Sequence, residues 1–154
     1  MADFKHILIA VDFGESSDEA TDLAIDLATK FGAALTLVHT YEIPSYAYPN
    51  ASFLVVDLLA PIEDAARQQL DKALESVRAR LPSAKSVLRR GVPSTEILSV
   101  IDEVHPDLVV VGTHGRRGIG RALLGSVAEK IVRLSPVPVL TVRHVGSAAK
   151  KQSG

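Results

Sequence analysis

The sequence predicts a single α/β domain, built as an open parallel β-sheet with helices on both faces. Five short apolar segments alternate with segments in which apolar residues recur at helical spacing. Strands separated by helices favour parallel pairing, because the helix returns the chain to the starting end of the sheet. The chain has 154 residues and is 47% hydrophobic but only 5% aromatic. One domain with a largely aliphatic core is therefore expected.

The first strand and helix have clear local signals. The apolar segment His6–Val11 predicts a buried strand. The next helix is predicted to begin near Ser16, because Ser16 and Glu19 have the spacing of a capping box. Gly32 is expected to end it in the left-handed conformation. Its apolar face is predicted from residues at helical spacing, namely Ala20, Leu23, Ala24, Leu27, Ala28 and Phe31.

The second strand and helix are separated by an irregular segment. Ala34–Thr40 is predicted as a strand, and residues 41–60 hold two prolines and all three tyrosines. We interpret residues 41–60 as a loop or lid that leads into a helix from about Pro61 to Arg80. The inner face of that helix is predicted to consist of Ile62, Ala66, Leu70, Ala73, Val77 and Leu81.

The remaining elements repeat the alternation. The helix that begins at Ser126 is expected to bury Val127, Ile131 and Leu134, and Pro136 ends it. The predicted strands and helices, in order, are Ala84–Leu88 (strand), Ser94–Val104 (helix, with Pro93 at its start), Leu108–Val111 (strand), Ser126–Leu134 (helix) and Val137–Val142 (strand).

The composition excludes several classes of protein. Lys and Arg total 17 against 18 Asp and Glu, which argues against a nucleic-acid-binding surface. Without cysteine there are no disulfides, thiolate metal sites or cysteine nucleophiles. The first apolar run is only five residues long, too short for a signal peptide or a membrane span. We expect a cytoplasmic protein whose domain covers residues 1–145, followed by a flexible tail at 146–154.

A glycine- and arginine-rich loop follows the strand Leu108–Val111. Glycine permits close backbone approach, and the first amides of a helix carry partial positive charge. No acidic residue lies between Asp107 and Glu129, so the loop is locally cationic. A strand, this loop and a helix N-terminus together predict an anion site, although a flexible surface connection is the simpler alternative. The loop residues in question are Gly112, Gly115, Arg116, Arg117, Gly118, Gly120, Arg121 and Gly125.

Two common phosphate-binding motifs do not fit this loop. A P-loop would need Lys and Ser or Thr after Gly120, but Arg121 and Ala122 follow. A dinucleotide-binding GxGxxG fingerprint should follow the first strand, where the sequence reads Val11-Asp12-Phe13-Gly14. The remaining pattern is Gly112-x2-Gly115-x9-Gly125-Ser126.

This pattern resembles the nucleotide-binding signature of the universal stress protein family, in its ATP-binding branch. The resemblance covers residues 4–143. It implies a five-stranded, Rossmann-like (adenine nucleotide alpha hydrolase-like) sheet of order 3-2-1-4-5. That order opens a crevice at the carboxyl ends of the first and fourth strands, where nucleotides bind in such sheets. Asp12 and Gly112 are expected to meet across the ligand.

The resemblance also implies roles for individual residues. Adenine is expected to contact Ala10, Val11 and the main chain of Thr40. Asp12 is expected to bind ribose or amino hydrogens, and the ribose is expected to contact Val111 and Gly112. The glycine loop is expected to bind the phosphates. Asp12 alternatively forms an Asx turn or a cap before the first helix, Ser126 a simple N-cap, and His114 a loop-packing contact. His39 and His105 are interpreted as structural. The complete predicted set is Ala10, Val11, Asp12, Thr40, Val111, Gly112, His114, Gly115, Arg116, Gly125, Ser126 and Val127.

The predicted function is ATP binding by a stress-response or signalling module, with Mg²⁺ carried by the phosphates. No catalytic residue is assigned. No protein metal ligand is assigned either, because no two histidines have metal-ligand spacing together with a carboxylate. The alternative is a slow ATPase or adenylyl-transferring enzyme, although the HIGH, KMSKS and SGGxDS motifs are missing. A family member that binds no nucleotide is a third reading. The resemblance implies a homodimer through Val137–Arg143, with room for a further protein partner.

Overall fold

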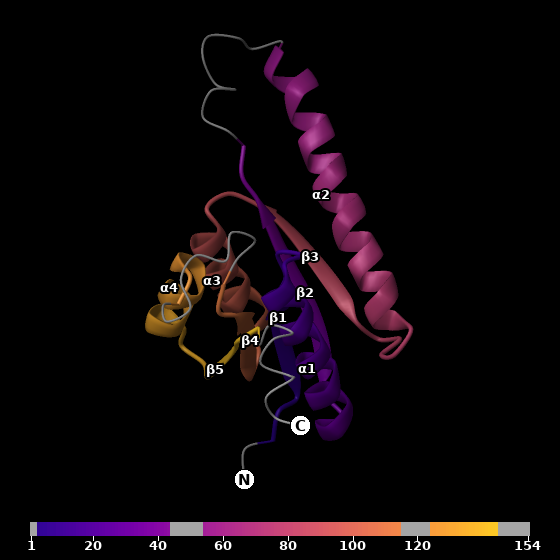
Figure 1. Cartoon of the computed structure of the whole chain (residues 1–154), viewed down its shortest axis with the longest axis vertical. Coiled ribbons are helices and arrows are strands. Elements are labelled where there is room, and N and C mark those ends of the chain that lie inside the picture. Colours follow the sequence, from indigo (N-terminus) through magenta and orange to yellow (C-terminus); the bar gives the residue numbers. More distant parts are fainter. Residues whose placement is uncertain (1–2, 44–53, 115–123, 145–154) are drawn as a thin grey trace, which may run out of the picture.

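Five strands that lie far apart in the sequence pair side by side into one parallel sheet (Figure 1). The structure is a computed structural model that describes residues 3–43, 54–114 and 124–144, with side chains from residue 59 onward in its second segment. The strand order is β3-β2-β1-β4-β5, which confirms the predicted sheet. The strands are β1 (His6–Ala10), β2 (Ala34–Tyr41), β3 (Lys85–Arg90), β4 (Leu108–Gly112) and β5 (Val139–Val142).

Helices cover both faces of the sheet, as predicted. The side chains of β1 alternate between two cores: Ile7 and Ile9 pack with α1 and α2, whereas Leu8 and Ala10 pack with α3 and α4. Figure 1 shows α2 on the opposite side of the sheet from α3 and α4. The helices are α1 (Glu15–Phe31), α2 (Leu54–Arg78), α3 (Pro93–Val104) and α4 (Ser126–Leu134).

The start of α1 differs from the prediction. Gly14 is the N-cap and no side chain caps the helix, so the Ser16–Glu19 capping box is wrong. Ser16 is buried, and Glu19 Oε1 lies 2.8 Å from His144 Nδ1, from the far end of the chain. The predicted apolar face is also wrong at Leu23, which is 36% exposed. At the other end, Gly32 has φ +65° and confirms the left-handed stop.

The helix α2 begins seven residues earlier than predicted. Residues 54–60 are helical rather than irregular, and Pro61 lies inside the helix instead of at its start. The helix-favouring run Leu58-Leu59-Ala60 thus outweighs Pro61, which predicts a helix boundary from the sequence alone. Residues 44–53 of the predicted lid lie outside the described part. In Figure 1 the amino-terminal part of α2 projects beyond the sheet.

Smaller corrections concern the ends of elements. β1 ends at Ala10, and β3 is Lys85–Arg90 rather than Ala84–Leu88. β5 begins at Val139 instead of Val137, because Pro136 and Pro138 have no N–H to donate. One further side chain was placed wrongly within its element, since Leu134 is 57% exposed. Val127 is partly buried against the core, and the fully buried residues of α4 are Ala128 and Ile131.

The carboxylate of Asp107 fastens the start of β1 beside the start of β4. Its Oδ2 accepts hydrogen bonds from the main-chain N–H groups of Lys5 (2.7 Å) and His6 (2.9 Å). The bond from Lys5, followed by that from His6, lowers the pKa of Asp107 below its ordinary value. A group whose pKa is lowered by folding contributes stability above its unfolded pKa and loses it as the pH falls.

We expect Asp107→Asn to be less stable than the wild type at pH 7, because the amide is a weaker acceptor than the carboxylate. The difference should begin to shrink as the pH falls below about 4, where the carboxyl group of the unfolded chain takes up a proton, and it should vanish once the folded carboxyl group is protonated as well. Urea unfolding of both proteins at a series of pH values measures this. A stability gap independent of pH would contradict the assignment.

Candidate functional site

A cavity of about 470 Å³ lies at the carboxyl ends of three central strands. The ends of β1, β2 and β4 form its floor, and the amino-terminal turns of α3 and α4 form its walls. This is the crevice expected where neighbouring strands send the chain to opposite faces of a sheet. Its lining consists of Ala10, Val11, Asp12, Ser17, Val38, His39, Thr40, Glu42, Pro93, Ile97, Val111, Gly112, Thr113, Gly125, Ser126, Val127 and Ala128.

Most residues singled out from the sequence meet at this cavity. His114 is described but is not among the lining residues, and Gly115 and Arg116 lie outside the described part of the chain. The cavity also has walls that the sequence did not indicate, including His39, Glu42 and Thr113. The predicted residues that line it are Ala10, Val11, Asp12, Thr40, Val111, Gly112, Gly125, Ser126 and Val127.

The turn after β1 is held by several local contacts. Asp12 Oδ1 accepts a hydrogen bond from the Gly14 N–H (2.8 Å), which confirms the alternative prediction that Asp12 forms an Asx turn. Asp12 N–H donates to Ser17 Oγ (3.0 Å). Phe13 has φ +66°, an unfavourable conformation for a bulky residue. This turn brings Asp12 to the cavity while α1 leaves along the other face.

His39 supports the same turn from β2. Its Nδ1 lies 2.8 Å from the carbonyl oxygen of Val11, so this nitrogen must carry the proton. Its ring packs against Phe13 at a centroid distance of 4.4 Å. The structural reading of His39 was therefore incomplete, because the residue also lines the cavity. No spacing in the sequence links His39 to Val11, so this contact could not be predicted.

The two ends of the glycine- and arginine-rich loop meet beside the cavity. Gly125 N–H donates to the Thr113 carbonyl (2.6 Å), and Thr113 N–H donates to the Val142 carbonyl of β5 (2.9 Å). Gly125 is the N-cap of α4, so Ser126 is its first helical residue and not the cap. Glu129 N–H makes the first bond within the helix, to Gly125 (2.9 Å). The amides of residues 126–128 precede it at the cavity wall.

Gly112 is required by packing as well as by its place at the cavity. A Cβ atom there would lie 2.8 Å from both the carbonyl carbon and the Cβ of Ser16. These atoms belong to the first turn of α1, whose backbone cannot move away cheaply. Gly125 differs, since its φ of −59° and ψ of 157° suit any residue.

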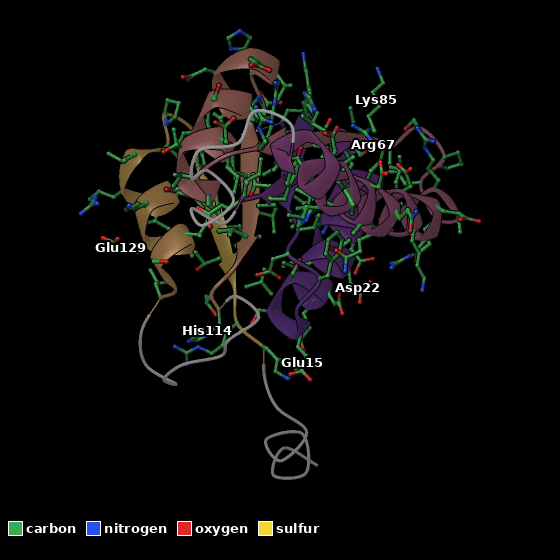
Figure 2. The ribbon with its side chains drawn as sticks, turned by 90° about the horizontal axis from the view of Figure 1, so that it is seen from above. Glu15, Asp22, Arg67, Lys85, His114 and Glu129 are labelled. Atoms are coloured by element: carbon green, nitrogen blue, oxygen red, sulfur yellow. The ribbon has the colours of Figure 1, made fainter. Side chains whose placement is uncertain are left out.

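Charge is distributed unevenly around the site. Burial raises the pKa of Asp18, and repulsion from Asp22, Asp12 and Glu15 raises it further. Figure 2 shows Glu15 and Asp22 along α1, with Glu129 on α4 across the molecule. In the described segments, we find no cluster of His, Asp and Glu arranged to hold a metal ion. None of the helices described there could span a bilayer.

Comparisons with known proteins identify one family. The model of the universal stress protein family matches residues 3–143. Universal stress protein A homolog 1 of Coxiella burnetii is 34% identical over 142 residues, covering 90% of this chain and 96% of the relative. A universal stress protein of Thermus aquaticus is 35% identical over 146 residues, covering 91% and 99%.

Solved structures share the architecture. UspA from Lactobacillus plantarum matches with a TM-score of 0.81 at 23% identity, over 93% of this chain and 100% of that chain. A universal stress protein in complex with cAMP has a TM-score of 0.68 at 24% identity, covering 94% and 100%. A family protein from Arabidopsis thaliana with AMP bound has a TM-score of 0.68 at 17% identity, covering 94% of each. At these identities the likeness shows the fold alone.

We expect Gly112→Ala to destabilise the protein by about 1–3 kcal/mol, because even a methyl group collides with the first turn of α1. Gly125→Ala should stay close to the wild type, since its backbone needs no glycine. Chemical denaturation of the three proteins measures the difference. Equal stability of Gly112→Ala and the wild type would show that the first turn of α1 does not pack closely against Gly112.

Proposed function

Because the chain belongs to the universal stress protein family, we propose that the cavity binds ATP and that its occupancy serves as a signal. The observation that carries this proposal is the position of the cavity. It brings the open ends of β1, β2 and β4 together with the first amides of α4. Its volume lies within the range of about 300–1,000 Å³ that is usual for small-molecule sites.

The main chain of Thr40 is suited to recognise the edge of a base. Val11 N–H donates to the Val38 carbonyl (2.9 Å), so the main-chain groups of Val38 face β1. Main-chain groups alternate along a strand, and the Tyr41 carbonyl accepts on the other side, from Gly91 (2.9 Å). The groups of Thr40 therefore face the space beyond the last residue of β1. One N–H and one C=O there offer adenine a fixed donor and acceptor.

The opposite wall is suited to phosphates. The amides at 126–128 precede the first hydrogen bond of α4 and carry the positive end of the helix dipole. Asp12 lies between the two walls, and a carboxylate can accept from a ribose hydroxyl as well as from Gly14. Magnesium would enter on the ATP phosphates, which are the usual ligands for this ion.

Two solved family members support an adenine ligand, since one is in complex with cAMP and the other has AMP bound. ATP as the physiological ligand of this chain, its signalling role and a cytoplasmic location are our proposals. We infer binding rather than catalysis as the main activity, because the sequence lacks the HIGH, KMSKS and SGGxDS motifs of the adenylyl-transferring enzymes.

Calorimetric titration tests the ligand. We expect Mg-ATP to bind to the wild type and GTP to bind more weakly, because the Thr40 main chain suits adenine. Gly125→Val should weaken ATP binding by about tenfold or more, by placing a branched side chain against the phosphate wall. Ala65→Val, on the exposed side of α2, is the matched control and should bind as the wild type does. No heat of binding with fresh wild-type protein would refute the proposal.

We also propose that the chain forms a homodimer through the edge strand β5. β5 is an edge strand of the sheet. The carbonyls of Pro138 and Val142 accept from Val109 and Thr113, so the even-numbered residues of β5 face β4. The main-chain groups of Thr141 therefore face outward, where an antiparallel copy could pair with them around a two-fold axis.

Thr141→Pro tests this arrangement, because it removes an outward N–H and leaves the bonds to β4 intact. We expect a dimer for the wild type and for Thr141→Val, which retains the N–H, but a monomer for Thr141→Pro. Light scattering at micromolar concentration measures the mass. A wild-type mass close to 16.4 kDa would contradict the dimer.

A further inference from the structure

Glu42 brings a carboxylate to the wall of the cavity just beyond Thr40. It follows the last residue of β2 and lines the cavity together with Pro93 and Ile97 of α3. Its neighbour Tyr41 lies on the other face of the sheet, where burial and the carboxylate of Glu63 on α2 raise the pKa of the Tyr41 hydroxyl. Because successive side chains of an extended chain point to opposite faces, Glu42 belongs to the face on which α3 packs.

The order of the main-chain groups along β2 determines which part of a purine would lie nearest Glu42. Within a residue the N–H precedes the C=O along the chain, so the Thr40 C=O lies nearer to Glu42 than the Thr40 N–H does. Adenine that pairs with both groups places an acceptor ring nitrogen at the N–H and its 6-amino group at the C=O. The 6-amino group therefore lies on the side of the base that faces Glu42.

The second hydrogen of that amino group needs an acceptor. The Thr40 C=O accepts one of the two amino hydrogens and leaves the other without a partner on β2. Glu42 lies about 7 Å beyond Thr40 along an extended chain, and a glutamate side chain together with a hydrogen bond of about 3 Å spans this distance. An ionised carboxylate accepts hydrogen bonds and donates none. Glu42 is therefore suited to the second amino hydrogen.

We propose that Glu42 determines purine specificity by selecting an amino group over an oxygen at position 6 of the base. This inference rests on the proposed function, since it requires a purine held at Thr40. With adenine, the Glu42 carboxylate accepts the second amino hydrogen. Guanine and hypoxanthine have an oxygen at position 6, so two acceptors would face each other with no hydrogen between them. Glu42 thereby adds discrimination by a side chain to the main-chain pattern of Thr40.

Titration with Mg-ATP and Mg-ITP tests this role, because the hypoxanthine of ITP differs from adenine only at position 6 and in the hydrogen that N1 gains. We expect the wild type to prefer ATP. Glu42→Gln should reduce the ratio of the two affinities by about three- to tenfold, because its amide can donate to the 6-oxygen. The Thr40 main chain and the phosphate wall are the same in both proteins, so the change in this ratio isolates the carboxylate.

Glu75→Gln is the matched control, since it removes the same charge from an exposed position of α2 that does not line the cavity. Its ratio of ATP affinity to ITP affinity should equal that of the wild type. If ATP binds but Glu42→Gln keeps the wild-type ratio, or Glu75→Gln lowers it equally, the role of Glu42 is overturned and the proposed function stands. Equal affinity of the wild type for ATP and ITP would also overturn the role of Glu42. If neither nucleotide binds to the wild type, the proposed function fails and this inference fails with it.

Discussion

The side of the sheet to which the chain turns after β1 and after β4 determines the rest of this structure. The two strands are neighbours, but α1 packs on one face and α4 on the other. The connections must diverge at the carboxyl edge of the sheet, and the space between them cannot be filled by either helix. The cavity lies in that space, and residues from both halves of the sequence line it.

The same backbone contacts serve the fold and the site. Gly112 allows the first turn of α1 to sit against the end of β4, and it also lines the cavity. Thr113 joins β5 to the N-cap of α4, and it also lines the cavity. A larger side chain at Gly112 would change the packing of α1 and the shape of the cavity together. Gly125 is different, because its backbone is relaxed and its small size matters mainly for the space in front of α4.

Local patterns in the sequence were sufficient for the individual strands and helices, whereas the resemblance to a family indicated most residues of the cavity floor. Apolar runs located the strands, and Gly32 correctly ended α1, because these signals depend on neighbouring residues only. The capping box failed because α1 begins at Glu15, so that Ser16 lies inside its first turn, and Glu19 instead contacts His144 from the far end of the chain. The start of α2 was not predicted because a proline usually marks a helix boundary, whereas Pro61 lies inside α2 and helix-favouring residues precede it.

The part of the site that was not predicted depends on contacts between segments far apart in the sequence. His39 and Thr113 reach the cavity through contacts with Val11, Val142 and Gly125, which come from other strands and from the helix α4. Spacing along one segment cannot reveal such contacts. The strand order itself came from a resemblance to a family, and the structure then confirmed it.

The central claim is that an adenine nucleotide lies between the Thr40 main chain and the first turn of α4. Titration of ¹⁵N-labelled protein with Mg-ATP, followed by backbone amide chemical shifts, tests it most directly. The account predicts the largest shifts at Thr40, Gly112 and residues 126–128, with little change along β3. Saturable shifts centred on β3 or on the outer side of α2, with none at residues 126–128, would contradict it.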